Sequence, residues 1–293
     1  MPEDECVGLG TFLGVFANPF RFIGDVTNEI RALSRIRLAD FDAVLYDLDG
    51  VITNTATVHA SAWKQLFDNF LKQSAERAGA AWKPFRLEED YRLYVDGKAR
   101  YDGVRDFLKS RNLALPLGSP DDRSDQETIY GLGNKKDEYF ETALHANGVL
   151  VYQATVRFLH LAKDAGLKTA VVSSSHHCRE ILDLAGLTSL FEAIIDGHEI
   201  DGLHLAGKPA PDAFLEAAKR LTVQPEKAIV IEDALAGVQA GHAGGFGLVI
   251  GVNRRDQAQA LRQHGADLVI ADLDELLPIT QASEPSSTPS VGK

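Results

Sequence analysis

Cysteine is almost absent from this chain of 293 residues, which carries only Cys6 and Cys178. Two cysteines are too few for a disulfide framework, so the sequence predicts a protein of a reducing compartment. Long apolar runs are lacking too, and none could span a bilayer. Residues 7–17 come nearest to the apolar part of a signal peptide, but acidic residues precede them where a signal peptide has basic ones. We therefore expect a cytoplasmic protein with no membrane partner.

Basic residues are also in short supply. The chain has 30 Lys and Arg against 42 Asp and Glu, a formal net charge of −12. A nucleic-acid partner requires clustered positive charge, so the sequence predicts none. A small anionic substrate stays possible, because its site needs only local positive charge. The apolar fraction of 45% is that of an ordinary globular protein.

What is present, from residue 43 onward, is an alternation of short apolar runs with helical patterns. Runs close to continuously apolar are typical of strands buried on both faces, as in a parallel sheet between helices. The sequence therefore predicts a doubly wound, Rossmann-like α/β core. The expected strands are Ala43–Tyr46, Thr169–Ser173, Ala228–Ile231, Leu248–Gly251 and Leu268–Ile270; the expected helices are Thr155–Ala165, Arg179–Ala185, Ala213–Leu221 and Leu235–Ala243.

Residues 54–149 interrupt this alternation. They contain no convincing buried strand but carry helical patterns such as Ala62–Phe70 and Val104–Ser110, which predicts a helical cap domain inserted after the first strand. The α/β core then comprises 41–53 and 150–279. Residues 1–40 form an N-terminal extension with a packing helix through Ile30, Leu33 and Ile36, and 280–293 a Pro/Ser-rich disordered tail.

Four polar clusters follow the expected strands or stand in the loops beside them, where open α/β sheets bind ligands. Asp47-Leu48-Asp49-Gly50 ends the first strand, with alternate carboxylates and a glycine that permits a sharp turn. Ser173-Ser174-Ser175 can hold phosphate oxygens at a helix start. Lys208-Pro209 places a cation in a loop. Glu232-Asp233 can complete an oxygen site for a hard cation such as Mg²⁺.

Each cluster alone has an ordinary explanation as a turn, a helix cap or a solvated strand end. Together, in this order and each at a strand end, they predict a phosphoryl-transfer site. They resemble the four motifs of the haloacid dehalogenase superfamily, and residues 54–149 resemble its helical cap. The resemblance implies that Asp47 attacks phosphorus to form an aspartyl-phosphate, and that Asp49 is the general acid and base. It also implies that Ser173 and Lys208 steady the phosphoryl group.

The same resemblance implies a Mg²⁺ site. Its ligands would be the Asp47 carboxylate, the Asp49 backbone carbonyl and Asp233, with Glu232 either a further ligand or placed just behind them. The dehalogenase and phosphonatase branches lack an acid at the position of Asp49, so the resemblance implies phosphate-ester chemistry.

The segment after Asp49 is most similar to the β-phosphoglucomutase-like subfamily. His59 and Trp63 share a helix face, and residues of a known mutase at those positions lie between cap and core; packing alone would explain them equally well. Gly97, Arg100 and Lys135 match cap positions near the substrate's non-reacting phosphate. Ser174 and Ser175 match sugar-phosphate contacts from the core. The chain departs from the subfamily at Asn54 and at His176-His177.

The resemblance implies a monomeric enzyme that interconverts β-D-glucose 1-phosphate and glucose 6-phosphate, with β-glucose 1,6-bisphosphate as the intermediate and activator. Two alternatives stay open. One is a sugar-phosphate phosphatase of the same superfamily, and the other is an inactive sugar-phosphate-binding scaffold.

Overall fold

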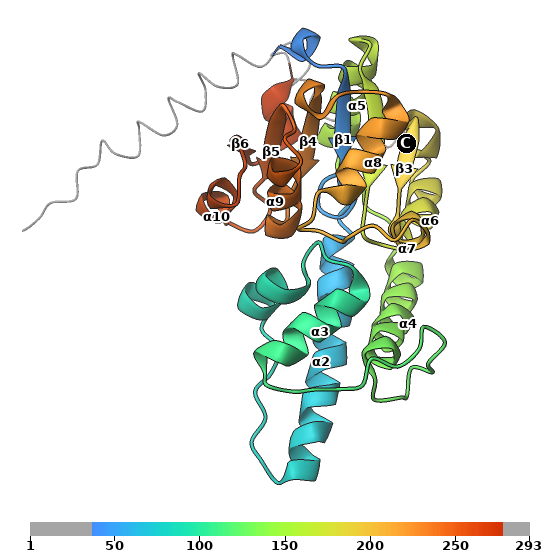
Figure 1. The fold of residues 1–293 in the computed structure, drawn as a ribbon, viewed down its shortest axis with the longest axis vertical. Helices are drawn as coiled ribbons and strands as arrows, with labels where there is room; N and C mark the ends of the chain where they lie inside the picture. Colours follow the sequence, from blue (N-terminus) through green and yellow to red (C-terminus); the bar gives the residue numbers. More distant parts are fainter. Residues whose placement is uncertain (1–36, 278–293) are drawn as a thin grey trace, which may run out of the picture. The chain divides into compact units, whose positions relative to one another are not determined.

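The computed structural model describes residues 37–277 (Figure 1). The helix expected through Ile30, Leu33 and Ile36 and the tail expected at 280–293 lie outside these residues. No helix in the described part of the chain is both long and apolar enough to cross a membrane.

A parallel six-stranded sheet forms the core, with the strand order β3-β2-β1-β4-β5-β6. Its strands are almost wholly buried, because helices cover both faces. The predicted doubly wound fold is confirmed. Five strands were expected, and the structure adds a sixth, β3, a three-residue edge strand. The strands are β1 (Ala43–Tyr46), β2 (Lys168–Val172), β3 (Ala193–Ile195), β4 (Ala228–Glu232), β5 (Leu248–Val252) and β6 (Leu268–Ile270).

Alternate strand residues face different helices. Leu45, Val172 and Val230 belong to a cluster that includes side chains of α8 and α9, whereas Tyr46 faces the other way onto Phe158 of α5. This layering buries both sides of every central strand. The helical elements of the core are η1 (Leu38–Asp40), α5 (Gln153–Asp164), α6 (Cys178–Leu184), η3 (Thr188–Leu190), α7 (Gly197–Gly202), α8 (Asp212–Leu221), η4 (Pro225–Lys227), α9 (Leu235–Ala243), α10 (Ala258–Gln263) and η5 (Leu273–Leu276).

The segment between β1 and α5 is helical and has its own apolar cluster, centred on Phe67, Phe85 and Phe107. We call residues 54–149 the cap; these limits stay a prediction. Figure 1 shows the cap helices gathered at one end of the sheet. They are α2 (Ala56–Ala78), the π-helical turn η2 (Leu87–Val95), α3 (Arg100–Ser110) and α4 (Ile129–Asn147).

The chain enters and leaves the cap through two adjacent segments. Thr53 forms an antiparallel bridge with Val151, and the Asn54 N–H donates to the Leu150 carbonyl at 2.8 Å. The Tyr152 hydroxyl donates to the Asn54 side chain at 3.1 Å. The two segments that connect the cap to the core are therefore hydrogen-bonded to each other.

Candidate active site

The sheet order determines which sequence clusters meet. β1 lies between β2 and β4, so the carboxyl ends of these three strands bring Asp47, Ser173 and Glu232-Asp233 together. Gly50 has φ +94°, and a Cβ there would collide with the Asp233 carboxylate. The glycine therefore allows the turn after β1 to pass directly beside Asp233.

Lys208 reaches this cluster from the loop before α8. Its ammonium donates to Asp47 Oδ1 at 2.6 Å, to Glu232 Oε1 at 2.7 Å and to the Val172 carbonyl at 3.3 Å. Burial alone would lower the pKa of Lys208, but Asp47 and Glu232 outweigh it and raise that pKa. Lys208 is therefore a charged, immobile cation beside Asp47.

Three buried carboxylates form a candidate cation site. Asp47, Glu232 and Asp233 each bring one oxygen to within 4.8 Å of the others. Among residues 37–277, Asp233 Oδ2 is buried with no hydrogen-bond partner and lies 3.7 Å from Arg255 in an ion pair. Burial raises the pKa of Asp47 and of Asp233, a cost that a bound cation would offset. These residues fit Mg²⁺, which prefers carboxylate oxygens.

Glu232 has less freedom than its neighbours. Its Oε1 accepts from Lys208, and its Oε2 accepts from the Ala234 N–H at 2.8 Å. This arrangement favours the second role predicted for Glu232, just behind the ligands. The ligand role of the Asp49 backbone carbonyl stays a prediction.

Asp49 points to the base of the cap. Its Oδ1 accepts from the Thr55 hydroxyl and lies 3.4 Å from His59 Nε2. His59 Nδ1 lies 2.7 Å from the Lys136 ammonium, which can only donate, so the ring proton is on Nε2 and faces Asp49. His59 also stacks on Phe140 at 3.9 Å. The chain Lys136–His59–Asp49 thus joins a cap helix to the strand-end motif.

Each member of this chain has a shifted pKa. Burial raises the pKa of Asp49, but His59 and Thr55 outweigh it and leave the pKa lowered. Burial and Lys136 lower the pKa of His59, so the ring is neutral at pH 7. Burial also lowers the pKa of Lys136 to about 8. In this arrangement Asp49 is a carboxylate, ready to accept a proton.

The pocket between cap and core brings most of the predicted residues together. Lys208 and Glu232 lie directly behind Asp47, through the hydrogen bonds given above. The predicted residues that line the pocket are Asp47, Asp49, His59, Trp63, Gly97, Arg100, Ser173, Ser174, Ser175 and Asp233.

Lys135 is placed elsewhere. Its ammonium pairs with Glu138 at 2.8 Å on the outer side of α4, and the neighbouring Lys136 lines the pocket instead. Successive helical residues point about 100° apart, so only one of the two lysines can face inward. The expectation that Lys135 faces the pocket is therefore corrected, since Lys136 lies there, and a contact with substrate stays a prediction.

Arg100 occupies the far wall of the pocket. It pairs with Asp137 and donates to His176 Nδ1 at 3.0 Å. That bond leaves the proton of His176 on Nε2, which lies 2.9 Å from Asp201. Burial and Arg100 lower the pKa of His176, so the neutral ring fixes the guanidinium without opposing its charge.

The serine run connects the core to the cap. Ser173 Oγ accepts from the Ser175 N–H at 3.1 Å, and the Ser174 hydroxyl donates to the Gly97 carbonyl at 3.0 Å. Gly97 has φ +70°, and a Cβ on it would lie 2.9 Å from that of Ala234. Cap and core thus approach as closely as backbone allows at this point.

Comparison with known proteins agrees with this geometry. A family model described as haloacid dehalogenase-like hydrolase matches residues 41–245. A β-phosphoglucomutase of Mycobacterium tuberculosis is 50% identical over 238 residues, which cover 80% of this chain and 91% of that protein. The chain belongs to the β-phosphoglucomutase-like subfamily of the haloacid dehalogenase superfamily.

Further members of the subfamily extend the comparison. A β-phosphoglucomutase of Bacillus subtilis is 30% identical over 80% of this chain and 91% of its own length. A crystal structure of the β-phosphoglucomutase of Clostridium difficile is 25% identical, with a TM-score of 0.61, over 81% of this chain and 93% of the other. The likeness therefore spans both core and cap.

Two further charged residues near the pocket, Asp96 and Arg255, were not predicted from the sequence. Asp96, beside the pocket, pairs with Arg255 from the loop after β5, and Arg255 also approaches Asp233. Burial raises the pKa of Asp96 to about 6. Neither residue follows an expected strand directly, and only the fold brings the two together.

Proposed function

We propose that this chain is a β-phosphoglucomutase that interconverts β-D-glucose 1-phosphate and glucose 6-phosphate through β-glucose 1,6-bisphosphate. The observation that carries the proposal is the pair of cationic sites in one pocket. Lys208 lies behind Asp47, and Arg100 lines the same pocket from the cap. A mutase must hold two phosphates at once, and the relatives named β-phosphoglucomutase support this reading.

Asp47 is the proposed nucleophile. One of its carboxylate oxygens attacks phosphorus while the bond from phosphorus to the sugar oxygen breaks, which leaves an aspartyl-phosphate. Lys208 fixes the orientation of Asp47 and neutralises charge on the phosphoryl oxygens. Mg²⁺ held by Asp47 and Asp233 would add positive charge beside the same group.

Asp49 is the proposed proton carrier. Its lowered pKa keeps Asp49 ionised, so in a first step it can take the proton from the sugar hydroxyl that attacks phosphorylated Asp47. The bisphosphate then turns around, and protonated Asp49 donates to the sugar oxygen that leaves when Asp47 attacks the other phosphate. One proton thus serves both halves of the cycle.

The magnitudes agree with this division of roles. Phosphate monoester hydrolysis needs accelerations of up to ~10²¹-fold, and a general acid supplies only about 10²–10⁴ of such a factor. Positioning and charge neutralisation must supply most of the remainder. The buried ammonium of Lys208 and the carboxylate cluster are suited to that part.

The test is an assay of the full chain with β-glucose 1-phosphate and Mg²⁺, with and without a trace of β-glucose 1,6-bisphosphate. We expect glucose 6-phosphate to form, with a lag that the bisphosphate removes. Steady release of inorganic phosphate without glucose 6-phosphate would establish the phosphatase alternative instead. No turnover of either kind, together with substrate binding, would favour an inactive scaffold.

A further inference from the structure

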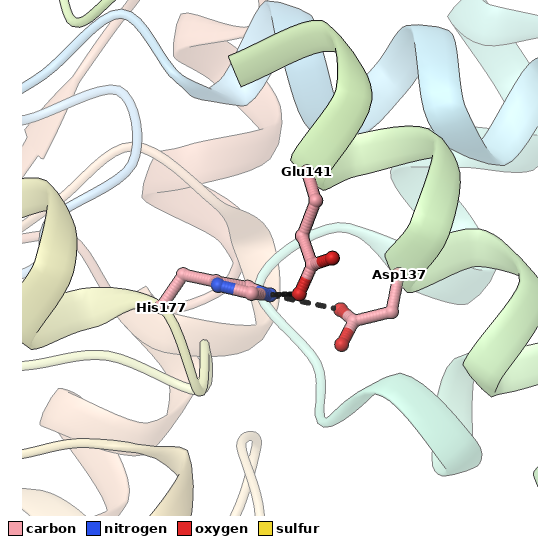
Figure 2. Close-up of side chains that lie close together, drawn as sticks. All are labelled: Asp137, Glu141 and His177. Atoms are coloured by element: carbon pink, nitrogen blue, oxygen red, sulfur yellow. Dashed lines mark hydrogen bonds and ion pairs between the residues drawn. The ribbon is translucent and has the colours of Figure 1, made fainter. Parts of the chain in front are cut away.

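Cap and core also meet beside the pocket, where α4 passes the start of α6 (Figure 2). Asp137 and Glu141 are one turn apart on α4, and His177 immediately precedes α6. His177 Nε2 lies 3.2 Å from Asp137 Oδ1 and 3.8 Å from Glu141 Oε1. All three atoms lie within 4.8 Å of one another. Neither Glu141 nor His177 lines the pocket or has a role in the proposed reaction.

The hydrogen bonding of His177 determines what this cluster can hold. Nδ1 lies 3.1 Å from Glu180 Oε2, and an ionised carboxylate can only accept, so Nδ1 carries the proton. In the neutral ring, Nε2 then turns a lone pair toward two carboxylate oxygens. Three acceptors that face one another require a positive charge between them, which is either a second proton on the ring or a metal ion.

We propose that Asp137, Glu141 and His177 form a binding site for a divalent transition-metal ion such as Zn²⁺, separate from the Mg²⁺ site at Asp47. Zinc bonds of about 2.0–2.2 Å in a tetrahedron place ligand atoms roughly 3.4 Å apart. The separations of 3.2 and 3.8 Å from Nε2 bracket that value. The nitrogen ligand selects Zn²⁺ over Mg²⁺, which prefers oxygen.

The surroundings of the three ligands also suit a metal. Glu180 on Nδ1 supplies the carboxylate that typically orients a metal-binding histidine. Arg100 pairs with Oδ2 of Asp137 and leaves Oδ1 for the ion. The Glu141 side chain is 51% exposed, so an ion can enter from solvent and a water molecule can take the fourth position.

A metal ion at this site would tie the cap to the core, because two ligands belong to α4 and the third precedes α6. Its occupancy would favour the arrangement in which these elements touch, and so would slow any step that opens the pocket. Binding itself does not depend on which sugar phosphate the chain converts, so it can be tested without substrate.

The experiment is a titration of the full-length chain with Zn²⁺ against a chromogenic chelator, in saturating Mg²⁺ to occupy the Asp47 site. We expect one equivalent of Zn²⁺ to bind. His177→Gln should weaken binding by about 100-fold and Glu141→Gln by about 10-fold, since orienting partners alone account for 10–100-fold. The matched controls are His160→Gln, an exposed residue of α5, and Glu138→Gln on α4, which should bind as the wild type does.

Cobalt gives a second measurement on the same variants. Co²⁺ bound to one nitrogen and two carboxylates should show visible ligand-field bands that His177→Gln removes, while circular dichroism checks that the variant is folded. The proposal is overturned if the wild type binds no Zn²⁺ in the presence of Mg²⁺. That result would assign the cluster to a protonated His177. Unchanged affinity in both His177→Gln and Glu141→Gln would overturn it as well.

Discussion

Asp47 and Lys208 depend on each other because both are buried. Lys208 is 3% exposed and has two carboxylate partners, while burial raises the pKa of Asp47. Loss of Lys208 would leave Asp47 buried without a positive partner, whereas loss of Asp47 would leave Lys208 paired with Glu232 alone. Lys208 therefore opposes the effect of burial and favours the ionised form of the proposed nucleophile.

Asp47→Asn removes the proposed nucleophile at nearly unchanged volume. We expect kcat to fall by about 10⁴–10⁶-fold, because an amide cannot form the aspartyl-phosphate. Steady-state kinetics with β-glucose 1-phosphate measures the loss, and trapping of phosphorylated protein should fail in the variant. Residual activity within 100-fold of the wild type would mean that another residue is the nucleophile.

Lys136 predicts a pH dependence. Its pKa is lowered to about 8, so below pH 8 its ammonium donates a hydrogen bond to His59, and above pH 8 it becomes a neutral amine. We expect kcat/KM to decline above about pH 8, because a neutral amine can accept as well as donate a hydrogen bond and no longer fixes the tautomer of His59. Lys136→Met should be about 10-fold less active and should lack this decline.

The matched control for that experiment is Lys135→Met, one residue earlier and directed outward. It should keep both the activity and the pH profile of the wild type. If Lys135→Met instead raised KM strongly and Lys136→Met did not, the placement of the two lysines would be reversed.

The two lysines also show which parts of the site could be predicted from the sequence and which could not. The meeting of Asp47, Ser173 and Asp233 could be predicted because strand ends in a parallel sheet must meet. Lys208 lies in a loop, and only the family resemblance indicated its place beside Asp47. In the cap, Lys135 and Lys136 are adjacent on one helix, so only one of them can point into the pocket, and the family motif did not show which. A usable signal was present: Lys136 continues the buried stripe of Leu132, Phe140 and Leu144 at steps of four.

Among the secondary-structure elements, most of the strands were predictable, but β3 was missed. β3 and the predicted β6 are both three-residue apolar strands at the sheet edges, so length alone does not explain the difference. A turn signal, Asp196-Gly197, directly follows β3 and could have marked its end. The π-helical turn η2 was not assigned from the sequence, although Leu87, Tyr91 and Val95 recur within it at steps of four. It is nevertheless the element that leads directly to Asp96 and Gly97.

The apolar cluster of the cap predicts where its stability resides. Phe107 is fully buried, and its ring lies 4.0 Å from that of Phe67 and 4.9 Å from that of Phe85. Phe107→Ala should lower the free energy of unfolding by about 3–5 kcal/mol in urea denaturation. Leu93→Ala is the control: Leu93 is 45% exposed, and its loss should cost within about 0.5 kcal/mol. Equal effects of the two substitutions would contradict this packing.

Contacts between cap and core link the candidate Mg²⁺ site at Asp233 to Asp96, which lines the pocket. Arg255 pairs with Asp96 and stands 3.7 Å from Asp233 Oδ2. Asp96 therefore holds the guanidinium back from a carboxylate that is expected to bind Mg²⁺. The contact between Asp96 and Arg255 could not be predicted from the sequence, because 158 residues lie between them in the chain.

Asp96→Asn should weaken Mg²⁺ binding about 10-fold, because Arg255 would turn to Asp233 and compete with the ion. The measurement is the Mg²⁺ dependence of activity at saturating substrate. Arg255→Gln added to Asp96→Asn should restore much of the affinity. An unchanged Mg²⁺ dependence in Asp96→Asn would show that Arg255 does not compete at this site.

The paired crossings at Thr53–Val151 and Asn54–Leu150 have a further consequence. Since the two ends of the cap lie against each other, both covalent connections between the core and the cap pass through one place. Any helical insert whose ends meet at that spacing can be joined there at little entropic cost. Selection for a different substrate can thus exchange the insert, while Asp47, Lys208 and Asp233 keep their places at the end of the sheet.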